Sequence, residues 1–217
     1  MPSSSVTPAH ERPTWRGWMH VVAFTLAIPG GILLIVLAES AEAKVGAAVY
    51  MASLLLGFGT SAGYHRLART ERTRELMQRL DHSMIFVLIA GSYTPICLLG
   101  LPPAWGIPIL CVVWAGAALG VVLKQVAFDR LRWLEIALYP ILGWIVVVAT
   151  PALFDGLTTT ELALLFAGGL LYTVGIPVLV LEKPDPWPRT FGYHEVWHTF
   201  TVAAAACHFA TITLLVV

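Results

Sequence analysis

Long apolar runs separated by short polar segments make up almost the whole chain after residue 14. Seven of these runs have about the length that an α-helix needs to cross a bilayer, roughly 17–25 residues. A lone strand would leave its backbone groups unpaired in lipid, so each run is predicted to be a helix. The pattern predicts an all-α integral membrane protein, a bundle of seven transmembrane helices. The runs cover approximately residues 17–38, 45–65, 80–99, 103–123, 134–154, 160–181 and 193–216.

The segments outside these runs set the domain organisation. Residues 1–14 are polar and contain Pro and Ser, which predicts a disordered tail ahead of one transmembrane domain, residues 15–217. The first apolar run is too long for the apolar core of a signal peptide, roughly 7–15 residues, so it is interpreted as a span. The basic segment 66–79 is predicted to be a solvated helical connector. Kinks are expected at the prolines inside spans, which are Pro29, Pro95, Pro140 and Pro177.

Composition supports the membrane assignment. Apolar residues make up 58% and charged residues 12% of the chain, against about 45–50% and 25% in soluble domains. The formal net charge is zero, so no overall field favours a nucleic-acid partner. Cys97, Cys111 and Cys207 all lie in apolar runs without CxxC spacing, which favours small hydrophobes within spans over a disulfide framework.

The distribution of Lys and Arg predicts the orientation. If the N-terminus is cytoplasmic, the tail and the segments 66–79, 124–133 and 182–192 all lie inside. Together they hold 12 of the 13 basic residues, and Lys44 alone lies outside. Cytoplasmic loops of membrane proteins are enriched in Lys and Arg. The chain is therefore predicted to be a multi-pass protein of the cell membrane with a cytoplasmic N-terminus and an external C-terminus.

Three histidines and one aspartate are predicted to share one depth. His194 and His198 are four residues apart at the start of the last span, so they lie on one helical face. His65 ends the second span and Asp81 begins the third. Ends of even spans and starts of odd spans lie on the same side of the membrane, here the cytoplasmic side. Ser61 lies one turn before His65, about 6 Å deeper in the bilayer.

This constellation is typical of a catalytic zinc site. His65, His194 and His198 would supply three neutral nitrogen ligands and leave a fourth position for water. Asp81 could then accept the proton of that water and protonate a leaving group. Ser61 could hydrogen-bond a substrate oxygen or a ligand. Other transition metals also accept three imidazoles, so the metal itself stays open.

Single residues of this kind also have structural interpretations. The remaining histidines, His10, His20, His82 and His208, are interpreted as interfacial or bundle hydrogen-bonding residues. Asp81 alone could be a first-turn helix residue.

The segment from His194 to His198 also matches H-E-x-x-H, in which Glu195 would be the general base of a metalloprotease. That interpretation is disfavoured because Glu195 lies about 100° around the helix from His194. In addition, Asp81 and His65 already supply a base and a third ligand.

These residues resemble the hemolysin III family, the bacterial branch of the progestin and adipoQ receptor family, which includes the adiponectin receptors. The resemblance covers nearly the whole chain and rests on residues 61–66, 80–83 and 90–95 together with the two histidines of 194–198. It implies a seven-helix bundle with its N-terminus inside and zinc held by three histidines near the inner face. On this chain the ligands would be His65, His194 and His198, with Asp81 contacting the zinc-bound water and Ser61 beside them. Related receptors and alkaline ceramidases are linked to lipid-amide hydrolysis and to membrane-lipid homeostasis.

The leading hypothesis is a zinc-dependent, ceramidase-like hydrolase of an amide or ester acyl bond in a membrane lipid, with a role in membrane-lipid homeostasis. The alternative is a non-enzymatic, zinc-stabilised sensor or receptor-like protein for which a lipid is the ligand. A cytolytic hemolysin-type pore and an intramembrane metalloprotease are further alternatives. The pore is disfavoured because no charged or amphipathic lining is visible in the sequence.

Overall fold

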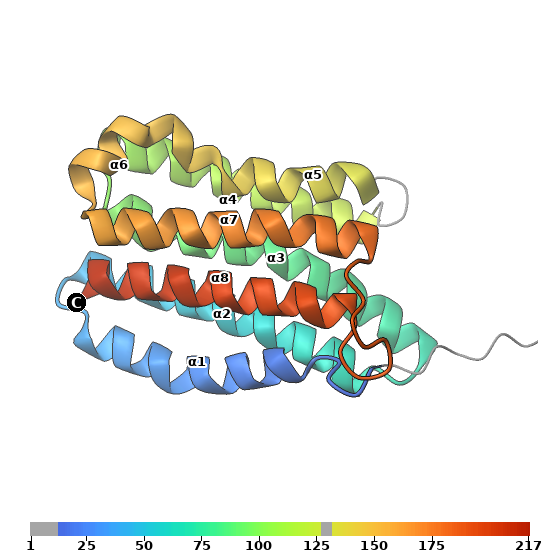
Figure 1. Ribbon diagram of the computed structural model, residues 1–217. Helices are drawn as coiled ribbons and strands as arrows, with labels where there is room; N and C mark the ends of the chain where they lie inside the picture. The colour runs from blue at the N-terminus through green and yellow to red at the C-terminus, as the bar shows by residue number, and fades with distance from the viewer. Residues whose placement is uncertain (1–12, 127–131) are drawn as a thin grey trace, which may run out of the picture.

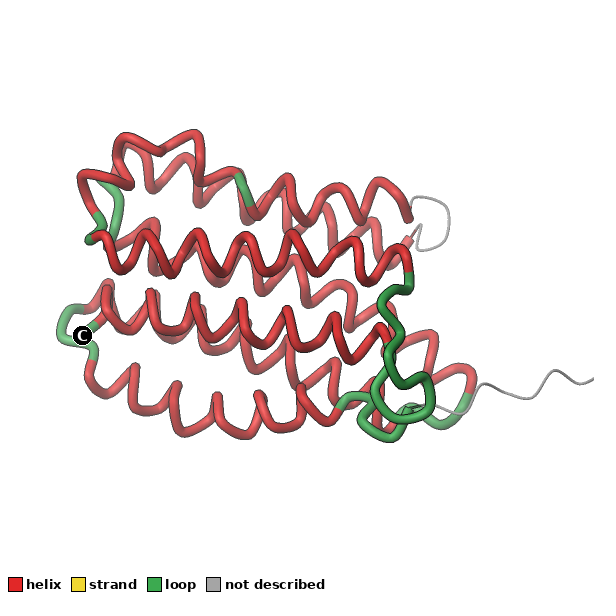
Figure 2. The backbone as a smooth tube through the Cα atoms, in the orientation of Figure 1, coloured by secondary structure: helices red, strands yellow, loops and turns green. Residues whose placement is uncertain are grey.

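The computed structural model describes residues 13–126 and 132–217, and this part of the chain is almost entirely helical (Figures 1 and 2). Within it, the only bridge of strand type is an isolated pair between Trp187 and Phe191. The helices are α1 (Trp18–Leu37), α2 (Ala41–Leu67), α3 (Glu71–Leu99), α4 (Pro103–Val126), α5 (Arg132–Gly143), the 3₁₀-helix η1 (Ile145–Ala149), α6 (Thr150–Gly156), α7 (Thr159–Leu181) and α8 (Tyr193–Val216).

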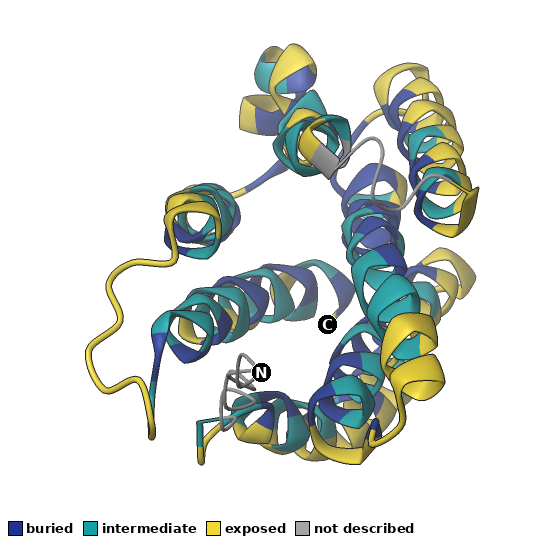
Figure 3. Cartoon of the chain, turned by 90° about the vertical axis from the view of Figure 1, so that its right-hand side faces the viewer, coloured by how far each residue is buried: buried dark blue, intermediate teal, exposed yellow. Residues whose placement is uncertain are grey.

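Seven helical segments of the described chain are long and apolar enough to cross a membrane, which confirms the predicted number of spans. The fifth of them, Ile136–Gly156, combines most of α5 with η1 and α6. Large apolar side chains such as Leu26 and Val148 are 66% and 65% exposed on the outside of the bundle. Viewed along the bundle, exposed positions lie mainly on its outer faces and buried positions face inward (Figure 3). An apolar outer face is what lipid requires and what water would disfavour.

The start of α1 and the C-terminus lie at opposite ends of the bundle (Figure 1), as an odd number of spans demands. The end that holds the start of α1, the turn 68–70 and the loop 182–192 is called the basic end below, because Arg69, Lys183 and Arg189 lie there. Residues 1–12 of the predicted tail lie outside the described residues. The last tail residue, Thr14, belongs to the folded part, because its backbone N–H donates to the Arg189 carbonyl at 3.1 Å.

The predicted connector 66–79 is not a separate helix: its first residues end α2 and most of it forms the start of α3. The turn is limited to 68–70, and α3 begins at Glu71 with Thr70 as its N-cap, whose hydroxyl accepts from the Thr73 N–H at 3.2 Å. The charged first turns of α3 are exposed, so this helix extends beyond the apolar layer. Asp81 consequently lies ten residues after Glu71, about 15 Å along the helix, rather than in the first turn.

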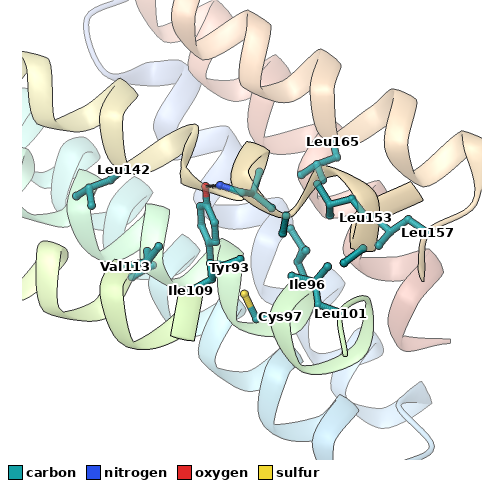
Figure 4. Close-up of a cluster of buried hydrophobic side chains, with 14 of the residues drawn as sticks. Tyr93, Ile96, Cys97, Leu101, Ile109, Val113, Leu142, Leu153, Leu157 and Leu165 are labelled. Carbon is teal, nitrogen blue, oxygen red and sulfur yellow. Dashed lines mark hydrogen bonds between the residues drawn. The ribbon is translucent and has the colours of Figure 1, made fainter. Parts of the chain in front are cut away.

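Kinks were expected at four prolines, and near one of them, Pro140, the helix ends. Helices α1, α3 and α7 continue through their prolines, whereas α5 ends at Gly143 and the chain continues as η1. The Tyr93 hydroxyl of α3 donates to the Gly143 carbonyl at 2.7 Å. It also accepts from the Val146 N–H at 3.0 Å, the bond that is dashed in Figure 4. A buried side chain thus pairs with the backbone groups that the break releases, which makes the break tolerable within a membrane span.

Two hydrophobic clusters fill the interior. One gathers side chains of α3 to α7, including Val113 and Leu153, and part of it is drawn in Figure 4. The other gathers side chains of α1, α2 and α8, including Tyr50 and Ile212. Of the three cysteines, Cys97 is buried, Cys207 is half-buried and Cys111 is exposed.

Candidate metal centre

His65, His194 and His198 converge at the basic end of the bundle. One nitrogen from each ring lies within 4.8 Å of the others, and His65 and His198 are buried. The Nε2 atoms of His65 and His194 are 3.1 Å apart. Two imidazoles bound to one tetrahedral zinc ion at 2.0–2.1 Å would have their nitrogens about 3.3 Å apart. The structure therefore brings together the three ligands that the sequence predicted, in a group that could hold a metal ion.

The start of α8 is fixed by Glu195. One carboxylate oxygen accepts from the Gly192 N–H at 2.8 Å, and the other accepts from Arg16 Nε at 2.5 Å. The Glu195 side chain is completely buried, and Arg16 is 19% exposed. Both oxygens already have partners, so Glu195 orients the first turn of α8, which carries His194. This arrangement argues against the general-base role that the H-E-x-x-H match would give it.

The segment 13–17 lies against the loop 182–192 and against α2 beside His65. Backbone N–H groups of Thr14 and Trp15 donate to the carbonyls of Arg189 and Thr190, each at 3.1 Å. Gly17 then turns the chain with a φ of 79°, and a Cβ at this position would lie 2.6 Å from the Cβ of His65. A side chain is thus excluded both by the left-handed conformation and by the close approach.

Asp81 and Ser61 line the same cavity as His194 and His198. Ser61 is buried one turn before His65 on α2, and Asp81 lies on α3. All five predicted site residues are therefore near one another, and Asp81 arrives there from within α3.

Sequence reasoning missed one residue of this site, His20. Its ring stacks on that of His198 with centroids 3.8 Å apart and planes 15° apart. Its Nε2 atom lies 3.1 Å from the Thr201 hydroxyl, and the residue is buried and lines the cavity. His20 opens the first span, so the rule that placed Asp81 and His194 at one depth applies to it equally. That signal was present in the sequence.

The other two described histidines make the hydrogen bonds expected of bundle residues, and both also line the cavity. His82 Nδ1 lies 3.4 Å from Lys124 Nζ, and His208 Nε2 lies 3.3 Å from the Leu165 carbonyl. His10 lies outside the described residues.

The histidine cluster contains a buried nitrogen without a hydrogen-bond partner. Among the described residues, the buried side-chain nitrogens without a hydrogen-bond partner are Nδ1 of His20 and Nδ1 of His198. Leaving a buried imidazole nitrogen unpaired costs about 1–3 kcal/mol, and such atoms are rare. A bound ion could take up nitrogen lone pairs that the protein leaves unused. The donor set of three imidazoles suits zinc and other transition metals.

A cavity of about 190 Å³ begins at this cluster and continues into the bundle. Its walls come from α1, α2, α3, α5, α7 and α8 and include the apolar side chains of Phe58, Leu88 and Ile176. The histidine cluster thus lies at the polar end of a mainly apolar cavity.

Comparisons with known proteins give consistent matches over most of the chain. The family model for haemolysin-III-related proteins matches residues 9–209. The chain is 32% identical over 193 residues to the hemolysin-3 homolog of Bacillus subtilis (strain 168), covering 88% of this chain and 87% of that protein. It is 34% identical over 200 residues to hemolysin-3 of Bacillus cereus, covering 91% and 88%. Human monocyte to macrophage differentiation factor is 26% identical over 201 residues, covering 90% and 80%.

Proposed function

The chain belongs to the haemolysin-III-related family, and from its buried histidine cluster we propose that it is a zinc-dependent hydrolase of an acyl bond in a membrane lipid. It is a multi-pass protein of the plasma membrane. One observation carries the proposal: His65, His194 and His198 converge, and His194 and His198 line a cavity that Asp81 and Ser61 also line. Metal ligands, a carboxylate and a hydroxyl are the groups that metal-assisted hydrolysis requires.

In this proposal the histidines hold zinc, which supplies Lewis-acid activation of water and of an acyl carbonyl when bound. Asp81 accepts a proton from the attacking water and later delivers it to the leaving nitrogen or oxygen. Ser61 hydrogen-bonds the Asp81 carboxyl and holds it towards the histidines.

The apolar walls of the cavity favour a lipid as the substrate. An amide or ester bond placed at the histidine cluster would leave room for an acyl chain beside Phe58, Leu88 and Ile176. Burial of methylene groups there contributes about 0.8 kcal/mol each. The bond and the chain of an acyl lipid thus match the polar and the apolar part of one cavity. A contribution to membrane-lipid homeostasis follows if such lipids are turned over in the cell.

The alternative is a sensor in which zinc only ties α2 to α8 and stabilises the fold. The link between His65 on α2 and His194 on α8 supports this alternative as well. The two functions differ in the role of Asp81, which is needed for turnover but supplies no ligand nitrogen.

The test uses purified full-length protein with Asp81→Asn and, as a matched control, Asp155→Asn, which changes an exposed carboxylate on α6. Zinc content and release of fatty acid from lipid amides and esters are measured together. We expect Asp81→Asn to keep its zinc and to lose turnover by about 100-fold or more. The control should match the wild type in both. A zinc-loaded wild type that releases no fatty acid from either lipid class would overturn the hydrolase and favour the sensor.

A further inference from the structure

The cavity carries a second polar pair far from the histidine cluster. Tyr172 on α7 and His208 on α8 both line it, with ring centroids 5.7 Å apart and planes 53° apart. His208 follows His198 by ten residues on the same helix, which corresponds to about 15 Å along the axis. The pair therefore lies deep in the membrane-spanning part of the bundle, where polar groups are costly.

Each member of this pair has unused hydrogen-bonding capacity. His208 Nε2 lies 3.3 Å from the Leu165 carbonyl, which can only accept, so Nε2 carries the hydrogen and Nδ1 is left as an acceptor. No described residue donates to this Nδ1 atom or hydrogen-bonds the Tyr172 hydroxyl. The neighbouring polar side chains on the cavity wall, in contrast, already have hydrogen-bond partners within the protein. Tyr93 is bonded to backbone, and Trp144 Nε1 donates to Thr173 Oγ1 at 2.9 Å.

A plain hydrocarbon chain in the cavity would leave the Tyr172 hydroxyl and His208 Nδ1 unpaired, which carries a desolvation cost. A hydroxyl group on the chain can donate to Nδ1 and accept from Tyr172 at the same time. We propose that Tyr172 and His208 form a subsite for a hydroxyl group in the middle of an acyl chain. This inference rests on the proposed function, because it assumes that the acyl carbonyl lies at the histidine cluster.

The distance between the histidine cluster and the Tyr172–His208 pair determines which carbon of the acyl chain must carry the hydroxyl. A carbonyl held near His198 and a hydroxyl held by His208 are separated by about 15 Å. A hydroxyl next to the carbonyl would remain at the histidine cluster, and one near the middle of a long chain would reach the subsite. The preferred lipids are therefore those with mid-chain hydroxylated acyl groups.

The experiment measures binding, so it does not depend on hydrolysis. Purified full-length protein in detergent is titrated with stearic acid, with a mid-chain monohydroxystearic acid and with α-hydroxystearic acid, each displacing a fluorescent fatty acid. We expect the mid-chain hydroxy acid to bind roughly threefold to tenfold more tightly than stearic acid, the gain of one net hydrogen bond. The α-hydroxy acid should show no such gain.

Two variants and a control test the residues. Tyr172→Phe removes only the hydroxyl and should abolish the preference, and His208→Leu should do the same by removing the acceptor. Tyr93→Phe also deletes a tyrosine hydroxyl on the cavity wall, but one that is bonded to the protein, and it should keep the preference.

Equal binding of the plain and mid-chain hydroxylated acids by the wild type would overturn the subsite, since water alone would then satisfy the pair. A preference that survives in both Tyr172→Phe and His208→Leu would overturn it too. Either result leaves the hydrolase proposal to its own Asp81 test, and a failed Asp81 test leaves the binding preference measurable.

Discussion

At the scale of single residues, His20 has the clearest consequence for the metal site. Its ring covers one face of His198, and its Nε2 atom is held by Thr201 three residues further along α8. Stacking at 3.8 Å restricts rotation of the His198 ring. Groups that orient a ligand side chain typically change metal affinity by 10–100-fold.

Replacing His20 with alanine should therefore weaken zinc binding by about tenfold without removing a ligand. The measurement is a competition titration of purified protein against a chromogenic chelator. His208→Leu is the matched control, because His208 is another cavity-lining histidine with no contact to the metal cluster. Equal zinc affinities in the wild type and His20→Ala would show that stacking does not orient His198.

Zinc should also stabilise the folded chain, because His65 and His194 join helices that are far apart in sequence. Removing zinc with a chelator is expected to lower the melting temperature of the wild type, since a ligand that binds only the folded state shifts its stability. The His65→Ala variant should melt lower than the wild type and should not respond to the chelator. A chelator response of the same size in both proteins would place the metal elsewhere.

The closeness of the three histidines could be predicted from the sequence because it follows from short-range spacing and from the alternation of the spans. The role of Glu195 could not. Its partner Arg16 is 179 residues away and was counted only as a basic residue of the N-terminal tail. Sequence spacing says nothing about which side chain of a distant segment reaches a buried carboxylate.

At the scale of elements, the N-terminus of α8 depends on the pairing of Arg16 with Glu195. This pair joins the segment before α1 to the helix that carries His194 and His198. It also satisfies the backbone N–H of Gly192, one of the unpaired donors at the start of a helix.

Glu195→Gln should destabilise the protein by about 2–4 kcal/mol, because it leaves the largely buried Arg16 guanidinium without a counter-charge. Thermal or denaturant unfolding in detergent would measure this loss. Glu71→Gln is the control, since Glu71 is also a first-turn glutamate, at the start of α3, but is exposed. If both variants unfold like the wild type, the ion pair does not hold α8 in place.

The seven spans were predictable as elements, but two of their details were not. Hydrophobicity indicates only the part of a helix that lies in the bilayer, so the predicted third span left out the polar first turns of α3. The Thr70–Thr73 cap is a local sequence signal for these turns. The break after α5 depends on Tyr93, which lies 50 residues before Gly143 in the chain. No local pattern could indicate that a distant hydroxyl would pair with the released backbone groups.

At the scale of the whole molecule, the metal cluster and most basic residues lie at the same end of the bundle. The positive-inside rule then predicts that this end is cytoplasmic and that the C-terminus, at the other end, is external. Lipids of the cytoplasmic leaflet would therefore have the most direct access to the histidine cluster.

The orientation can be tested with reporters fused to the C-terminus. Alkaline phosphatase, which folds only outside the cytoplasm, is expected to be active there, and green fluorescent protein exported in the same position should stay dark. The opposite result would place the metal cluster at the external leaflet and would invert the choice of lipid substrates.

The central claim is that His65, His194 and His198 bind one zinc ion together, and X-ray absorption at the zinc edge of the purified protein tests it most directly. The account predicts one zinc ion per chain with three imidazole nitrogens at about 2.0–2.1 Å, retained in Asp81→Asn and lost in His65→Ala. Protein that is fully folded without zinc after supplementation, or a zinc spectrum unchanged in His65→Ala, would contradict it.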